Sequence, residues 1–354
     1  MAVRLSDIAQ DLGVSTVTVS KVLRGKGDIS KRTRALVLKR MKELNYKPNM
    51  LARGLASGRS YAIGLVVPDL VHPFFGELAK SLGGALRQSG LALLISSAEE
   101  DPAIEQREIQ SLLDRGVDAL LVASCQSPDL AKKFFRSEQT PLLFVDRNFP
   151  ALAKDFVGSN DILVGEVATR HLIEIGRRRI AHIGTQDIST SVDRLRGYRV
   201  ALADAGLSVS KDYVVTRARF EERGDSAGFQ AMQKLLRLKQ KPDAVFCYND
   251  LSAIGAMEAA MQAGLRIPRD IAFVGCGNLR YDEYLKVPLS SVDHSTERMG
   301  QLAAKLALDL IADPARPPQT IQLLPTLVVR QSSVASRHAR ASARDMSASR
   351  RSPS

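Results

Sequence analysis

The sequence contains no tryptophan and only three cysteines, and it holds no apolar run of the roughly 20 residues that a membrane-spanning helix needs. Cys125, Cys247 and Cys276 are odd in number, and each lies in an apolar stretch. This predicts reduced thiols in the core, neither a disulfide framework nor a metal site. The N-terminal residues MAVRLSDIAQ lack the apolar core of a signal peptide. We therefore expect a cytoplasmic protein without a membrane partner.

Catalytic and cofactor signatures are also scarce. The sequence has no phosphate-binding P-loop and no H-E-x-x-H pair, and its five histidines show no metal-ligand spacing. The one enzyme-like pattern is GDSAG at residues 224–228, which satisfies the G-x-S-x-G rule of a hydrolase nucleophile elbow with Ser226 as nucleophile. That elbow needs a strand directly before the serine, whereas the preceding residues FEER are polar and charged. We expect no enzyme, no cofactor and no metal, and keep a hydrolase as a remote alternative.

Positive charge is abundant but confined to the two ends of the chain. Residues 1–60 hold 13 Lys and Arg against 4 Asp and Glu, and residues 331–354 hold 5 against 1, whereas residues 61–330 hold 32 against 33. A near-neutral middle joined to a basic N-terminal module suggests that the small module meets a polyanion. A solvated basic face would give the same counts, so charge alone does not decide.

Three amphipathic helices are predicted in residues 1–48. Ser6 is placed to cap the first helix and Gly13 to end it, while Ser15 and Ser30 are placed to cap the second and third. Only a tight turn fits between the first two, which is the pattern of a helix-turn-helix unit with a supporting helix. The side chains predicted to face inward are Ile8, Ala9, Leu12, Val19, Val22, Leu23, Leu36, Val37, Met41 and Leu44.

The second helix begins in GVSTVTVSKVL, residues 13–23, and is rich in β-branched residues that are poor helix formers. Short side chains let a recognition helix approach base edges in the major groove. Thr16 and Thr18 can offer hydroxyls, Val17 an apolar contact to a thymine methyl, and Lys21 a donor to guanine or phosphate. The residues of this helix predicted to bind DNA are Ser15, Thr16, Val17, Thr18, Ser20 and Lys21.

The stretch NYKPNMLARGLASGRS at residues 45–60 follows, with Pro48 ending the third helix before a short amphipathic turn and a Gly/Ser linker. Here the sequence closely resembles the lactose-repressor (LacI/GalR) family of bacterial transcription regulators: VRLSDIAQDLGVSTVTVSKVL resembles its headpiece, and residues 49–55 resemble its hinge helix. The resemblance implies that paired hinge helices enter the minor groove, where Leu55 wedges between base pairs. The hinge residues it implicates in DNA binding are Asn49, Ala52 and Leu55.

From residue 61 the chain alternates apolar strands with amphipathic helices, which predicts α/β structure with parallel sheets covered on both faces. The resemblance implies a two-lobed core of the type I periplasmic-binding-protein fold, crossed three times by the chain. On that basis the first lobe takes residues 61 to about 160 and 290 to about 320, and the second takes about 161 to 289 and 321 to 330. The predicted domains are an all-α headpiece (1–48), a hinge and linker (49–60), the core (61–330) and a disordered basic tail (331–354).

Ligands of such sheets bind at the carboxyl ends of strands, where polar residues follow several apolar runs. The resemblance assigns a cleft-lining position to the Phe74–Phe75 pair, a hydroxyl acceptor to Asp146 and an effector clamp to Arg194, whose planar fork can hold two oxygens. For Asp250 a role as helix N-cap competes with ligand binding, and a core role competes for the two phenylalanines. The predicted effector-binding residues are Phe74, Phe75, Asp146, Thr190, Arg194, Phe220, Asn249, Asp250 and His294.

One position departs from the family pattern. In VGCGN the family usually has an aspartate where this chain has Gly277, followed by Asn278. Losing that carboxylate puts a neutral sugar in doubt and leaves sugar acids, phosphate esters, nucleobases or a protein partner open. The resemblance implies a homodimeric repressor that binds a pseudo-palindromic operator in double-stranded DNA. A small-molecule effector, either a sugar derivative or a purine, is expected to control it, with control by a protein partner as the alternative.

Overall fold

The computed structural model describes residues 3–23, 29–46, 59–135, 140–152, 154–186, 188–217 and 224–334. It divides into two compact units, Met1–Ser60 and Tyr61–Ser354.

The small unit consists of three helices, α1 (Leu5–Asp11), α2 (Thr16–Leu23) and α3 (Lys31–Glu43). Side chains from all three form one apolar cluster, in which Ile8, Val19 and Val37 are fully buried. The turn between α1 and α2 passes through Gly13 at φ +60, a left-handed conformation that glycine adopts without steric cost. The predicted helix-turn-helix with its supporting helix is confirmed.

Two local predictions in this unit are wrong. Helix α1 starts two residues earlier than a cap at Ser6 predicts, because the Asp7 carboxylate accepts the Arg4 backbone N–H at 2.8 Å and makes Arg4 the N-cap. Leu36 is 49% exposed, since it lies about 100° around the helix from Val37, which faces the core. The caps at Ser15 and Ser30 are confirmed, because each hydroxyl accepts the backbone N–H three residues later at 3.1 Å.

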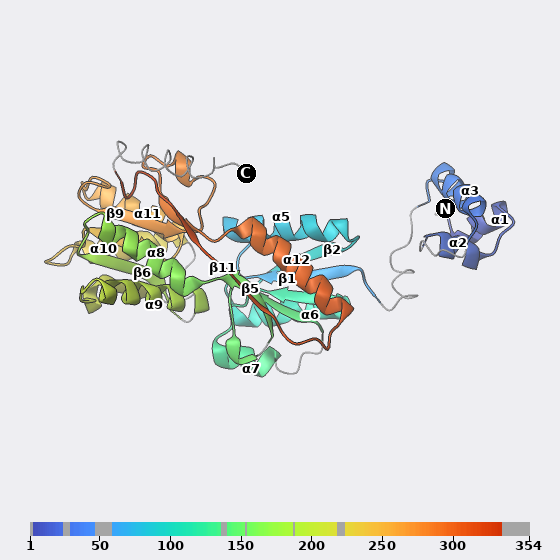
Figure 1. The fold of residues 1–354 in the computed structure, drawn as a ribbon, viewed down its shortest axis with the longest axis horizontal. Helices are drawn as coiled ribbons and strands as arrows, with labels where there is room; N and C mark the ends of the chain where they lie inside the picture. The colour runs from blue at the N-terminus through green and yellow to red at the C-terminus, as the bar shows by residue number, and fades with distance from the viewer. Residues whose placement is uncertain are drawn as a thin grey trace, which may run out of the picture. The chain divides into compact units, whose positions relative to one another are not determined.

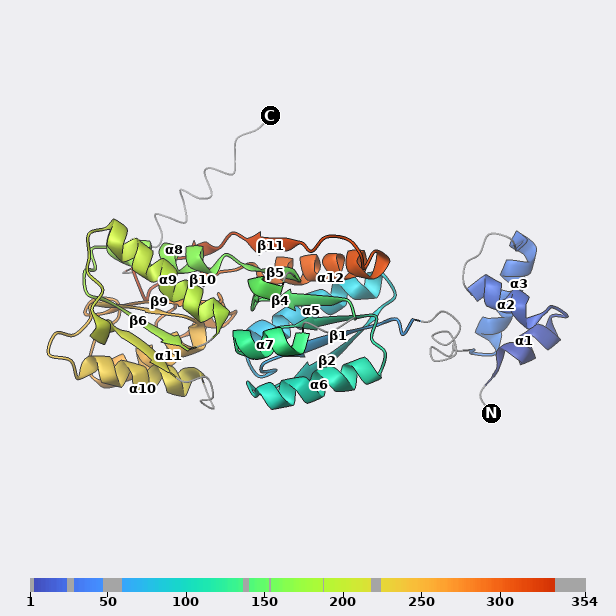
Figure 2. The same cartoon turned by 90° about the horizontal axis from the view of Figure 1, so that it is seen from below.

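The large unit contains two six-stranded sheets (Figures 1 and 2). The first has the order β11-β5-β4-β3-β1-β2 and is entirely parallel; the second has the order β12-β10-β9-β8-β6-β7, and only β12 is antiparallel. The strands of the first sheet are β1 (Ala62–Val67), β2 (Ala92–Ser97), β3 (Ala119–Val122), β4 (Leu142–Val145), β5 (Asp155–Ser159) and β11 (Thr320–Leu323). Those of the second are β6 (Ile180–Thr185), β7 (Val214–Arg217), β8 (Ala244–Cys247), β9 (Ala272–Cys276), β10 (Ser290–Asp293) and β12 (Thr326–Val328).

Helices cover both faces of each sheet. In the first lobe α5 and α12 pack on one face and α6 and α7 on the other; in the second, α10 and α11 oppose α8 and α9 (Figure 2). Their bounds are α5 (Pro73–Gln88), α6 (Pro102–Asp114), α7 (Pro128–Phe135), α8 (Asp161–Glu174), α9 (Ser189–Asp204), α10 (Gly224–Leu236), α11 (Asp250–Gln262) and α12 (Thr296–Ala312), with 3-10 turns at Pro150–Leu152, Lys211–Tyr213 and Asp282–Tyr284. The predicted fold class is confirmed. The three cysteines are buried and free, as expected.

The chain crosses between lobes after β5, after β10 and after β11, as predicted, but two lobe boundaries were misplaced. Strand β10, residues 290–293, pairs in the second sheet and β11, residues 320–323, pairs in the first. Residues 331–334, assigned above to a disordered tail, are folded: Ser332 Oγ donates to the Phe273 carbonyl at 2.7 Å, and Ser333 is 3% exposed. The sequence did not predict this burial, because residues 331–334 are mostly small and polar.

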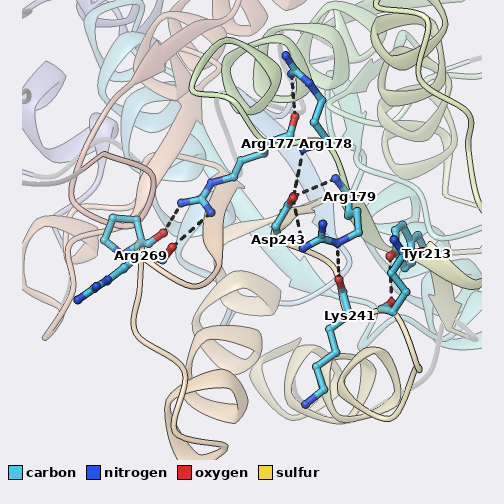
Figure 3. Close-up of polar contacts among 9 residues, drawn as sticks. Arg177, Arg178, Arg179, Tyr213, Lys241, Asp243 and Arg269 are labelled. Atoms are coloured by element: carbon cyan, nitrogen blue, oxygen red, sulfur yellow. Dashed lines mark hydrogen bonds and ion pairs between the residues drawn. The ribbon is translucent and has the colours of Figure 1, made fainter.

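One polar cluster ties together the amino ends of the second sheet's strands (Figure 3). The Asp243 carboxylate accepts the backbone N–H of Arg179 at 2.9 Å, and Arg179 Nε donates to the Lys241 carbonyl at 2.9 Å. Tyr213 Oη donates to the Gln240 carbonyl at 2.9 Å. These bonds join the starts of β6, β7 and β8, and so hold the strands whose opposite ends carry the site described next.

Candidate DNA-binding surface and ligand cleft

Helix α2 presents a polar face opposite the side that packs in the headpiece core. Val19 and Val22 are buried, whereas Ser15, Thr16 and Val17 are exposed, Val17 by 58%. Ser20 and Lys21 follow Thr16 and Val17 by four residues, which places all four on one helix face. Thr18 is half-buried, and its hydroxyl lies 2.9 Å from the Ser15 hydroxyl in the cap.

The three predicted hinge residues, Asn49, Ala52 and Leu55, lie outside the described residues, and so does Phe220. Their roles stay predictions.

A cavity of about 140 Å³ lies between the two lobes, at the carboxyl ends of the strands of both sheets. The first lobe contributes Asp69 and His72 after β1 and Asp146 and Arg147 after β4; the second contributes residues that follow β6, β8 and β9. Seven of the nine predicted effector residues line it together, and one of them, His294, comes from a crossing segment. The seven are Phe74, Phe75, Asp146, Thr190, Arg194, Asn249 and His294. The cavity is also lined by residues that were not predicted to bind an effector: Asp69, His72, Glu100, Arg147, Thr185, Ile188, Tyr248, Leu251 and Cys276.

The aromatic pair at the start of α5 belongs both to the core and to the cavity wall, the two roles considered for it in the sequence. Phe74 and Phe75 are 5% and 4% exposed and belong to the core of the first lobe, yet both also line the cavity. Their rings meet edge to face at 5.0 Å, and Phe74 lies 5.2 Å from the His294 ring. They form a rigid apolar wall.

Arg194 is held at three points of its guanidinium group. Nε donates to Asp161 Oδ1 at 2.7 Å, Nη1 donates to the Tyr248 carbonyl at 2.5 Å, and Nη2 lies 3.5 Å from His294 Nδ1. Asp161 and His294 both lie where the chain crosses between lobes, so Arg194 contacts two crossing segments. An arginine has five N–H donors, so this arrangement leaves donors for a ligand.

Arg147, the other guanidinium group in the cleft, is also paired with an acid. Its Nη1 and Nη2 donate to the two carboxylate oxygens of Glu100 at 3.0 and 2.6 Å. This bidentate pair joins the residue after β4 to the loop before α6.

Two polar groups at the cavity are buried. Among the described residues, His294 Nε2 has no hydrogen-bond partner, and Asp146 is 8% exposed, with the positive charges of Arg194 and Arg147 nearby. Asp146 also holds a left-handed conformation at φ +64, which is uncommon outside glycine. Buried groups of this kind are expected to be satisfied by a bound molecule or water.

Burial governs the ionisation of the cleft. It lowers the pKa of His72 to about 4 and, with the nearby charge of Arg194, lowers that of His294 well below its usual range. It raises the pKa of Asp146, and raises that of Asp161 to about 7 against the opposing charge of Arg194. Both histidines are therefore neutral near pH 7.

Two residues fit the cleft differently from expectation. Asp250 does not line the cavity, nor is it the cap of α11: Asn249 Oδ1 accepts the Ser252 N–H at 2.9 Å, while Asp250 is bonded to Ser291 Oγ at 2.6 Å. Gly277 does line the cavity, at φ +137, and a Cβ there would lie 2.8 Å from Asp250 Oδ2. Sequence spacing could not show this contact, because it joins the loop after β9 to the first turn of α11.

Three other features considered in the sequence are a hydrolase site at Ser226, a metal site and a membrane-spanning helix. Ser226 is exposed in the first turn of α10, in a groove whose described lining includes no histidine. Within the described ranges, no group of three or more His, Cys, Asp or Glu is placed to hold a metal ion. In the same part of the chain no helix is long and apolar enough to cross a bilayer.

Comparison with known proteins identifies relatives along nearly the whole chain. The model for bacterial regulatory proteins of the lacI family matches residues 4–49, and that for a periplasmic binding protein-like domain matches residues 169–333. The ribose operon repressor of Escherichia coli K12 is 33% identical over 93% of this chain and 99% of its own length. The HTH-type transcriptional repressor PurR of Proteus mirabilis is 33% identical over 93% of this chain and 96% of its own.

Solved structures show the same likeness. The transcriptional regulator CelR in complex with cellobiose is 31% identical, with a TM-score of 0.70 over 94% of this chain and 100% of that one. A lac repressor dimer bound to operator and the anti-inducer ONPF has a TM-score of 0.84 over 95% and 100%, and at 24% identity it shows the fold alone.

Proposed function

The chain belongs to the lacI family of bacterial regulatory proteins and is a DNA-binding transcriptional repressor with an effector-binding core; from that premise we propose which residues carry each role. The exposed face of α2, with Thr16, Val17, Ser20 and Lys21, reads the major groove of a pseudo-palindromic operator in the cytoplasm. Two copies of the chain act together, each occupying one half-site.

The hinge residues Asn49, Ala52 and Leu55 are proposed to enter the minor groove at the operator centre, with Leu55 as the wedge. This role rests on the family resemblance of their sequence.

The cleft between the lobes is proposed to bind the effector. The observation that carries this proposal is the cavity of about 140 Å³ that the buried Asp146 lines and at which His294 Nε2 is buried without a hydrogen-bond partner among the described residues. A sugar or sugar derivative fits best: hydroxyls can donate to Asp146 and accept from Arg194, while the Phe74–Phe75 wall takes the apolar face. Names of relatives point to similar ligands, a ribose operon repressor and a cellobiose complex, and PurR keeps a purine as the second candidate.

Lobe closure would connect this site to DNA. Arg194 contacts two of the three crossing segments through Asp161 and His294, so a ligand on Arg194 acts directly where the lobes hinge. A ligand shifts an open–closed equilibrium by its difference in affinity for the two states.

The test is thermal unfolding of the purified full chain with ribose, glucose, cellobiose, adenine and hypoxanthine. A ligand at a hundred times its Kd should stabilise the fold by about 2.7 kcal/mol. Arg194→Met should abolish the shift, whereas Arg170→Met should keep it, because Arg170 is a half-exposed arginine of the same lobe that pairs with Asp204 on the surface. Stabilisation that survives Arg194→Met would contradict the cleft assignment, and no shift with any compound would favour control by a protein partner.

A further inference from the structure

The two guanidinium groups of the cleft are both neutralised inside the protein. Arg147 is 6% exposed and pairs with both oxygens of Glu100, and Arg194 is 4% exposed and pairs with Asp161. A buried arginine without such a partner would attract an anion strongly, because screening is weak away from water. Above the Asp161 pKa of about 7, each arginine with its partner still offers N–H donors but carries little net charge.

Among the described residues that line the cavity, the other charged groups are acids. Asp69 and Asp146 are the remaining carboxylates, none of these residues is a lysine, and His72 and His294 are neutral. With Asp161, which lies behind Arg194, the described residues set two cationic side chains against four carboxylates. The N-termini of α5, α9 and α11 reach the cavity and each adds about half a positive charge, which offsets the excess of acid without reversing it.

We propose that Glu100 and Asp161 are specificity-determining residues, which make the cleft select uncharged effectors and reject anions such as sugar acids and phosphate esters. This inference rests on the proposed effector role of the cleft. An anionic ligand entering it would lose its hydration and, among the described lining residues, meet no uncompensated cation, which is costly for a buried charge. An uncharged polyol or nucleobase would use the same donors and acceptors without that cost.

Gly277 replaces a carboxylate that is usual in the family, and its loss suggested room for an acidic ligand. The cavity nevertheless keeps the carboxylates of Asp69, Glu100 and Asp146, with Asp161 nearby. The acids that remain are enough to exclude anions. Asp161 does not line the cavity itself, and acts on the ligand through Arg194.

The test uses inorganic phosphate as the probe, so it does not depend on knowing the effector. Unfolding midpoints of the full chain are measured at pH 8, where Asp161 is ionised, in phosphate and in sodium chloride of equal ionic strength. The matched control is Asp204→Asn, which makes the same charge change beside the exposed Arg170 and measures any phosphate binding by the basic headpiece. The wild type and Asp204→Asn should respond alike.

Asp161→Asn should bind phosphate at least about tenfold more tightly than the wild type, because one uncompensated buried charge is worth more than that factor. Adding Arg194→Met should remove the gain. Should Asp161→Asn fail to fold, Glu100→Gln exposes the charge of Arg147 in the same way and should show the same gain.

Two results would overturn the proposal: phosphate stabilisation of the wild type that Arg194→Met removes, or no gain over Asp204→Asn in folded Asp161→Asn. The outcome is separable from the effector proposal. If no sugar or purine binds while Asp161→Asn gains phosphate affinity, the charge neutralisation stands and the effector assignment fails.

Discussion

At the scale of single residues, the most informative position is Gly277. The sequence alone presents it as a missing carboxylate, but the structure shows a backbone at φ +137 whose Cβ position lies 2.8 Å from Asp250 Oδ2. The Asp250 carboxylate accepts hydrogen bonds from Ser291 Oγ at 2.6 Å and from the Leu279 N–H at 3.2 Å, so it cannot move away from a Cβ at position 277 without breaking them. Glycine is therefore required here by its own backbone conformation and by the closeness of Asp250 at the start of α11.

Gly277→Ala should destabilise the fold by about 2–4 kcal/mol, from a disfavoured φ and from the contact with Asp250. Gly176→Ala separates the two causes, because Gly176 has φ +89 with nothing within 4 Å of its Cβ position, and should cost only about 1–2 kcal/mol. Urea unfolding of both variants measures the difference. Equal losses in the two variants would show that the Asp250 contact is unimportant.

At the scale of elements, helix α2 was predicted closely, because local signals define it. Ser15 caps it, Gly13 supplies the turn, and Val19 and Val22 recur at helical spacing. The error at Ser6 has a similar local origin: Arg4 and Ser6, two positions apart, could each cap α1, and the hydrogen bond from the Arg4 N–H to the Asp7 carboxylate decided where the helix starts. Sequence spacing does not rank such alternatives.

An operator for this test is selected from random DNA. Lys21→Ala should weaken binding to it by about 1–3 kcal/mol. If Lys21 contacts phosphate, the slope of log affinity against log salt should also fall by about 1 in magnitude. The matched control is Lys39→Ala on α3, a lysine whose side chain is 77% exposed and 3.9 Å from Glu43. Fluorescence anisotropy at several salt concentrations measures both. A loss in Lys39→Ala as large as in Lys21→Ala would contradict the assignment of α2 as the recognition helix.

At the scale of the whole molecule, two parallel sheets were expected from the apolar strands, yet the lobe boundaries were off by one strand twice. Strand β10 is short and lies directly before a crossing, and β11 and β12 are separated by two residues that cross between the lobes. A four-residue strand carries no periodic signal of which sheet it joins. Pairing with Val274 and Gly275 for β10, and with Phe156 and Val157 for β11, decides it.

Global stability should also depend on pH through buried histidines. His182 is fully buried, its ring stacks on Tyr198 with centroids 5.4 Å apart, and burial lowers its pKa to about 3. The unfolded chain has a higher histidine pKa, near 6.5, so it binds a proton first as the pH falls. The stability that neutral His182 contributes is therefore complete above about pH 6.5 and is lost progressively below it.

His182→Phe should remove this loss. The free energy of unfolding of the variant, relative to that of the wild type, should rise by up to about 3 kcal/mol as the pH falls from 7 to 4. Each pH unit below the unfolded histidine pKa costs the wild type about 1.4 kcal/mol of stability. Urea unfolding at each pH gives the difference between the two proteins, in which the contributions of His72 and His171 cancel. A difference that is constant from pH 7 to pH 4 would show that His182 is protonated in the folded state.

The sequence by itself determined what depends on neighbours along the chain: the helix-turn-helix, the caps of α2 and α3, the alternation of strands and helices, and the polar residues at strand ends. Most of the described effector candidates reach the cavity for that reason, because parallel strands bring their carboxyl ends to one edge.

Only the tertiary structure decided which of those polar groups neutralise one another. Arg194 and Asp161 are 33 positions apart, and Arg147 and Glu100 are 47 apart, so no spacing rule pairs them. The charge of the cleft, and with it the class of ligand proposed here, follows from these pairs, because the energy of a buried charge depends on what lies a few ångströms away in space.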